Sequence, residues 1–169
     1  MRTCTIITKS AAAITLVTSS AIATGSAIAS ADQGGTIVAL DSTLRNCDFS
    51  AVSTPPLGFE PALATGSVRI HKSGSTAVAE VYLSDSPEPG THFDVGLIQE
   101  PRPTSAGCGP GAPGTAFAGL DTDGAGVGRT TVQDTLRPGT TGVWVIVERP
   151  SPHSQDPGEY YTSEFVVPT

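Results

Sequence analysis

Short runs in which apolar and polar side chains alternate recur along most of this 169-residue chain. The clearest run is 142–148, where valine occupies every second position between Val143 and Val147. Successive side chains of a strand point to opposite faces of a sheet, so this period of two predicts β-strands. We expect strands over residues 36–40, 44–49, 67–72, 76–83, 92–99, 116–121, 127–135, 142–148 and 160–167.

Turn-forming residues separate these runs. Ser73-Gly74-Ser75 separates two of them, and Thr122-Asp123-Gly124-Ala125-Gly126 separates two more. In the second turn the Asp-Gly pair is expected to supply the positive φ angles that a tight hairpin requires. Helical periodicity is nearly absent after the N-terminal segment, so we expect little helix there.

The number and spacing of the runs predict an all-β domain, an antiparallel immunoglobulin-like β-sandwich of seven to nine strands. A closed barrel is the alternative arrangement. All fourteen prolines, and all but one of the nineteen glycines, follow residue 31 and are spread between the apolar runs. Trp144 follows both Cys47 and Cys108 instead of lying between them, so the arrangement of antibody domains is not expected.

The N-terminal segment has the pattern of a secretory signal peptide. Arg2 and Lys9 make its start positive, and a weakly apolar stretch follows that is shorter than the roughly 20 residues of a membrane span. Ala29-Ser30-Ala31 matches a small-residue cleavage site. We therefore predict a helical signal peptide over 1–31, cleavage near Ala31, and one secreted domain, extracellular or in the cell envelope, over 32–169.

Removal of that segment changes the cysteine count and the charge. Cys4 leaves with it, and the even pair Cys47 and Cys108 predicts one disulfide in an oxidising compartment. Seven Lys and Arg residues then remain against sixteen Asp and Glu, a net charge of about −9. Such a domain repels phosphate backbones and anionic bilayers, so we expect no nucleic-acid partner. No apolar segment follows the last strand, and we expect no membrane anchor in the mature form.

The familiar motifs of cofactor and catalytic sites fail here. Asp121 to Gly126 resembles a calcium loop only in part, because Ala125 and Val132 occupy positions where an EF-hand needs oxygen ligands. Gly124 to Thr130 lacks the spacing and the lysine of a phosphate-binding loop. No Gly-x-Ser-x-Gly elbow is present, and the three histidines share no motif: His71, His92 and His153. We predict no catalytic residue, no cofactor and no metal motif.

One group of carboxylates follows from strand direction. If strands from Ser67 onward alternate in direction, the loops after Leu83, Asp121 and Glu148 emerge at one end of the domain. These loops carry Asp85, Glu88, Asp121, Asp123, Asp156 and Glu159. We expect an acidic pole at this end, with simple solvation of the carboxylates as the default and binding of a divalent cation or a basic partner as the alternative hypothesis.

Several segments carry a family resemblance: Val81-Tyr82-Leu83, Phe93-Asp94-Val95, the hairpin 120–126 and the ending Tyr160 to Phe165. With them the chain resembles small exported proteins of high-GC Gram-positive bacteria, that is actinobacteria, with mycobacteria among them. It is also similar to chordin-type domains, which use a strand, glycine hairpin and strand pattern. The resemblance implies an immunoglobulin-like sandwich and carries no catalytic residues.

We expect a secreted, non-enzymatic binding module whose partner is a protein or an envelope ligand. A structural envelope protein and a divergent secreted hydrolase are the alternatives. An exposed patch at Trp144, Tyr82 or Tyr160 would favour binding, because large exposed apolar patches usually mark contacts. A cleft joining His92 or His153 to a carboxylate would favour the enzyme.

Overall fold

The computed structural model describes residues 34–53, 62–153 and 156–169, and this part of the chain is all-β. Its strands are β1 (Thr36–Asp41), β2 (Thr65–Ser73), β3 (Thr76–Ser84), β4 (His92–Glu100), β5 (Thr115–Asp121), β6 (Val127–Thr135), β7 (Gly142–Arg149), β8 (Glu159–Ser163) and β9 (Val167–Pro168). Within the described residues no helix has the length and apolarity to cross a membrane. The predicted signal peptide over 1–31 lies outside these residues.

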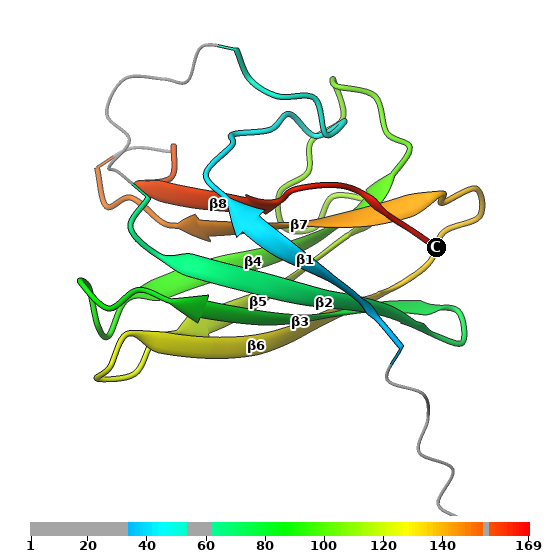
Figure 1. The fold of residues 1–169 in the computed structure, drawn as a ribbon. Helices are drawn as coiled ribbons and strands as arrows, with labels where there is room; N and C mark the ends of the chain where they lie inside the picture. Colours follow the sequence, from blue (N-terminus) through cyan, green and yellow to red (C-terminus); the bar gives the residue numbers. More distant parts are fainter. Residues whose placement is uncertain (1–33, 54–61, 154–155) are drawn as a thin grey trace, which may run out of the picture. The chain divides into compact units, whose positions relative to one another are not determined.

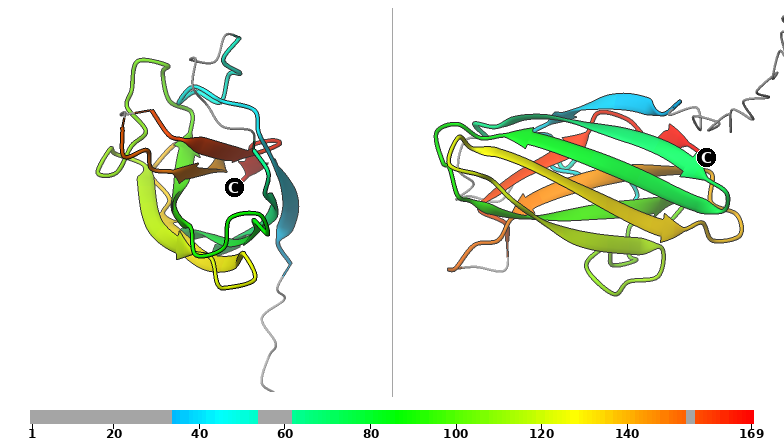
Figure 2. Two further views of the ribbon diagram at one scale, coloured as in Figure 1. Left: turned by 90° about the vertical axis from the view of Figure 1, so that its left-hand side faces the viewer. Right: turned by 90° about the horizontal axis from the view of Figure 1, so that it is seen from below.

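All nine strands are hydrogen-bonded into one antiparallel sheet that nearly closes on itself. The order is β5-β4-β7-β8-β1-β2-β3-β6, with β9 paired to β7. The sheet curls until its two end strands, β5 and β6, come into contact (Figures 1 and 2). Two register pairs, Leu40 with Ser163 and Asp41 with Thr162, join β1 to β8 and so connect the two halves. An immunoglobulin-like sandwich of two separate sheets is therefore not confirmed.

The main core fills the inside of the curled sheet, and the alternation of the sequence determines which residues enter it. On β3, β4 and β7, the apolar residues that share one face of the alternating pattern are all buried. Tight strand packing needs this pattern, since each buried Val or Leu side chain stabilises the fold by about 1.5–3 kcal/mol. The residues concerned are Ala77, Ala79, Val81, Leu83, Phe93, Val95, Leu97, Val143, Val145 and Val147.

A second apolar cluster lies on the outer face of β4 and β7. Its buried members are Ile98, Trp144 and Ile146. The predicted disulfide between Cys47 and Cys108 is present, with the two Cα atoms 5.5 Å apart, and it joins the loop after β1 to the loop after β4. Phe49 and Cys108 from these loops pack against the cluster. A disulfide is typical of an oxidising compartment.

Three details of the predicted elements are wrong. Residues 44–49 form no strand, because they belong to the loop over the outer cluster and contribute only a bridge between Arg45 and Ala51. The expected strand 160–167 is two strands, β8 and β9, separated by the turn that passes Phe165. In the hairpin after β5, the positive φ of 78° belongs to Gly126 and not to the Asp-Gly pair.

Candidate functional site

The acidic loops of the prediction lie at one end of the sheet. The loop between β3 and β4, the hairpin between β5 and β6, and the loop between β7 and β8 all emerge there (Figure 1). Backbone hydrogen bonds connect the first two: Asp85 N donates to Gly126 O at 2.7 Å, and Gly90 N donates to Asp123 O at 3.3 Å. The antiparallel alternation of strands explains why segments far apart in sequence meet here.

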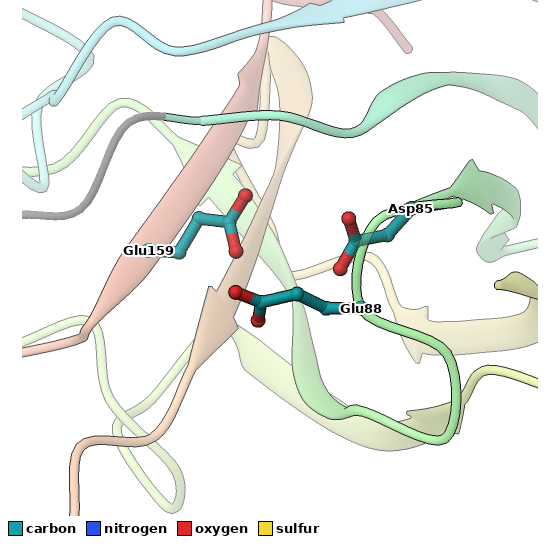
Figure 3. Close-up of side chains that lie close together, drawn as sticks. All are labelled: Asp85, Glu88 and Glu159. Carbon is teal, nitrogen blue, oxygen red and sulfur yellow. The ribbon is translucent and has the colours of Figure 1, made fainter.

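Three of the six predicted carboxylates form a close cluster. Asp85, Glu88 and Glu159 each offer one carboxylate oxygen, and these three oxygens lie within 4.8 Å of one another. Figure 3 shows the side chains converging from the loop after β3 and from β8. We call these three residues the carboxylate cluster.

The other three predicted carboxylates stand outside the carboxylate cluster. Asp121 Oδ1 lies 2.7 Å from Nδ1 of His92. Asp123 Oδ1 accepts hydrogen bonds from Val127 N at 3.0 Å and Ala125 N at 2.8 Å, and these bonds lower the pKa of Asp123 below its ordinary value. Asp156 is exposed on the loop before β8.

Glu159 and Glu88 have a shared cation. The guanidinium of Arg149, at the end of β7, lies 2.7 Å from Glu88 Oε2 and 3.4 Å from Glu159 Oε2. Glu159 is also held on its other oxygen, which accepts hydrogen bonds from the hydroxyl of Tyr161 and from Leu63 N at 3.1 Å. Burial and the bond to Glu159 raise the pKa of Tyr161 above its ordinary value, so the hydroxyl stays a neutral donor.

Asp85 has no such support. The residue is only 1% exposed, and neither carboxylate oxygen has a hydrogen-bond partner among the described residues. Burial, and then the negative charges of Glu159 and Glu88, raise the pKa of Asp85 above its ordinary value; the charge of Arg149 and the nearby backbone amide of Glu88 lower it by less. A buried carboxylate without a partner is costly, because protein groups have not replaced the water that solvated it.

A glycine allows the neighbouring hairpin to pack closely on Asp85. Gly126 has a φ of 78°, in the left-handed region that side chains disfavour. A Cβ atom there would overlap the carbonyl oxygen of Asp85. No local pattern indicates this requirement or the role of Arg149, because both depend on residues distant in the chain. Tyr161 lies two residues from Glu159 on the same face of β8, so the period of two could have identified that pair.

A separate hollow lies on the outer face of β2, β3 and β6. It has a volume of about 450 Å³ and is lined by Ile37, Ser67, Arg69, Glu80, Val81, Tyr82, Arg129, Thr130 and Thr131. We call it the outer groove. Arg129 stacks on the ring of Tyr82, with its guanidinium carbon 4.4 Å from the ring centre. Ile37 is 63% exposed beside it. Of the aromatic residues proposed for contact, Tyr82 is therefore accessible, whereas Trp144 and Tyr160 are buried.

The histidines lie apart from the carboxylate cluster and the outer groove. His92, at the start of β4, lies between two carboxylates, with Nδ1 2.7 Å from Asp121 and Nε2 3.5 Å from Asp94. His71 lies on β2 and His153 in the loop after β7. His92 is half exposed, and both of its ring nitrogens contact carboxylates.

Comparison with known proteins adds no relative. No protein-family model matches the chain, and no curated protein and no solved structure shows a significant match to it.

Proposed function

We propose that this protein is a secreted, non-enzymatic binding module, and that its contact surface is the outer groove. The observation that carries the proposal is the accessible pair of Tyr82 and Arg129 inside a hollow. Tyrosine and arginine are enriched in the residues that dominate binding energy at interfaces, because both combine a flat apolar surface with hydrogen-bonding groups. The rigid strands of the sheet hold both side chains in place without a partner.

The charge of the outer groove supports a partner that carries a carboxylate. Two guanidiniums, of Arg69 and Arg129, face the groove against the single carboxylate of Glu80. The contact between Arg69 and Glu80 is long, 4.0 Å, so neither group is fully engaged. Guanidiniums bind carboxylates with two parallel hydrogen bonds. Together with the exposed Ile37, the groove fits a protein segment with an acidic side chain next to an apolar one.

We also propose the location, the fold class and the origin that the sequence led us to expect. The disulfide supports an extracellular or envelope location after cleavage near Ala31. The facing halves β1-β2-β3-β6 and β5-β4-β7-β8 support an immunoglobulin-like class. An origin among exported actinobacterial proteins and a similarity to chordin-type domains rest on the sequence resemblance alone.

The two alternative functions have less support. The buried Trp144 and Tyr160 are consistent with a structural protein, but such a protein does not need the accessible Tyr82. A hydrolase was expected to show a cleft that joins a histidine to a carboxylate; His92 contacts Asp94 and Asp121, but none of these residues lines the outer groove.

Affinity capture with matched variants tests the proposal. Immobilised wild-type protein, Arg129→Glu and Lys72→Glu are exposed to culture-fluid and envelope fractions, and saturably bound proteins are quantified by mass spectrometry. Lys72 lies on β2 outside the groove lining, so its variant has the same charge change at a different place. We expect a protein that binds wild type and Lys72→Glu and binds Arg129→Glu at least about tenfold more weakly. Equal capture by Arg129→Glu, or no saturable partner, would overturn the proposal.

A further inference from the structure

Within residues 34–53, 62–153 and 156–169, the carboxylate cluster has three carboxylates and one guanidinium in contact with them. Arg149 is the partner of Glu88 and Glu159, and with all three carboxyl groups ionised this one guanidinium would leave two negative charges. A divalent cation would make the cluster neutral. Like charges enclosed at this distance repel strongly, since water screens them poorly there.

Asp85 provides an independent indication that a cation belongs in the carboxylate cluster. Its side chain is enclosed and directed at Glu88 and Glu159 (Figure 3), and both of its oxygens lack a hydrogen-bond partner within the described part of the chain. Protein chains rarely bury a carboxylate in this way, and when they do, the charge is paired or coordinates a metal ion. Surface solvation does not explain it, because the residue is 1% exposed.

The donor set and the spacing select the kind of cation. All three donors are carboxylate oxygens, which suit hard cations, and no histidine or cysteine takes part. Calcium binds oxygen at about 2.3–2.6 Å, so two ligands on opposite sides of one ion are about 4.6–5.2 Å apart. The limit of 4.8 Å among the three oxygens fits that span. Magnesium needs about 2.0–2.1 Å and keeps more of its water.

From these observations we propose that Asp85, Glu88 and Glu159 bind one calcium ion, with water at the remaining positions. Glu88, whose side chain is 39% exposed, forms the side through which the ion and its water enter. The site lies in the loop after β3 and at the start of β8, and none of its residues lines the outer groove. The bound ion ties the β3–β4 crossover to β8, so binding stabilises the fold.

Thermal unfolding of the EDTA-treated full chain tests this inference. CaCl₂, MgCl₂ and NaCl are added at matched ionic strength, because general screening alone stabilises an acidic protein. We expect calcium to raise Tm saturably, by about 5 °C, with a Kd of about 10⁻⁴–10⁻³ M as in extracellular calcium modules. Magnesium should give a smaller rise. No saturable rise with calcium, or an equal rise with NaCl, would overturn the site.

Two matched variants locate the effect. Asp85→Asn removes one charge and keeps the shape, and it should abolish the calcium-dependent rise while raising Tm in EDTA. Asp121→Asn, the same chemical change at the same end of the sheet, should keep the full calcium response. Should Asp85→Asn fail to fold, Glu88→Gln takes its place and should weaken calcium binding at least about tenfold. A calcium response that is retained in the cluster variants contradicts the assignment, and so does one that is lost in Asp121→Asn.

Discussion

The side-chain nitrogen of Gln99 donates a hydrogen bond to Asp134 Oδ2 at 2.6 Å, which links β4 to β6 across the nearly closed sheet. The same nitrogen donates to Thr135 O at 3.0 Å. The oxygen of Gln99 accepts from Arg137 N at 2.9 Å and from Thr140 Oγ1 at 2.7 Å. Gln99 is 2% exposed, so one buried amide connects β6 and the loop after it to β4 at the end opposite the carboxylate cluster.

Replacing Gln99 by methionine should therefore destabilise the protein. The change keeps the size of the side chain but leaves Arg137 N and Thr135 O without their partner, which costs about 1–3 kcal/mol. Urea unfolding measures the loss as a lower midpoint. Gln133→Met on the exposed face of β6 is the matched control and should change the free energy of unfolding by less than about 0.5 kcal/mol. Equal losses in the two variants would contradict the role of Gln99.

Breaking the disulfide should expose Trp144, the only tryptophan of the chain. The loops joined by Cys47 and Cys108 cover it, and the Phe49 ring lies 5.4 Å from the Trp144 ring. The two cysteines are 61 residues apart, so the unfolded chain gains entropy when the bond between them is removed. On the chain-entropy model the free energy of unfolding then falls by roughly 4 kcal/mol.

Fluorescence measures this exposure directly. In Cys47→Ser/Cys108→Ser we expect red-shifted tryptophan emission and faster quenching by iodide. Adding reductant to this variant is the control and should change nothing, whereas adding it to the wild type should reproduce the variant. Emission that stays unshifted in both would show that the loops cover Trp144 without the disulfide.

The contribution of the contact between His92 and Asp121 to the stability of the fold should depend on pH. The hydrogen bond to Asp121, together with the charges of Asp121 and Asp94, raises the pKa of His92. A raised histidine pKa means that protonation favours the folded state. The contribution is thus fully present below the unfolded pKa of about 6.5 and is lost as the pH rises through the folded value.

The size of this effect should be small, because His92 is half exposed. We expect less than about 1 kcal/mol between wild type and Asp121→Asn at pH 6, and a smaller difference at pH 8.5. An NMR titration of the His92 ring should give a higher pKa in wild type than in Asp121→Asn, with His153 as the internal reference. An identical His92 pKa in the two proteins would contradict the contact.

Replacing Glu148 by glutamine should stabilise the protein at neutral pH. Burial, and then the charge of Asp94, raise the pKa of Glu148. Asp94 lies directly opposite Glu148 in the β4–β7 register, and Tyr160 faces it from β8. Like charges in opposite positions destabilise a sheet by about 0.2–1 kcal/mol.

The gain in unfolding free energy from Glu148→Gln should depend on pH. A raised carboxyl pKa costs stability once the pH exceeds the unfolded value of about 4.3, so the advantage of Glu148→Gln should grow between pH 4 and 7. Denaturant unfolding at several pH values measures it. Glu80→Gln on β3 is the control, because Glu80 lies opposite Arg69 and its replacement should give no gain. A constant difference across this pH range would contradict the account.

The sequence by itself determined the local part of this protein. The period of two along β3, β4 and β7 depends only on neighbouring residues, so it predicted the strands and placed alternating valines such as Val143 and Val145 on one face. The even pair of cysteines left by the predicted cleavage likewise predicted the disulfide. Strand direction alone was enough to place the acidic loops at one end.

Only the tertiary structure decided how those parts meet. The single sheet, closed through β1 and β8, depends on register between residues more than a hundred positions apart, such as Leu40 and Ser163. The burial of Trp144 is also a tertiary effect. The alternating pattern assigns Trp144 to the outer face of the sheet, and it is buried there because two disulfide-linked loops fold over it. Glu159 likewise meets Asp85 and Arg149 because curvature of the sheet brings β8 against the loop after β3, a contact that no local pattern of side chains encodes.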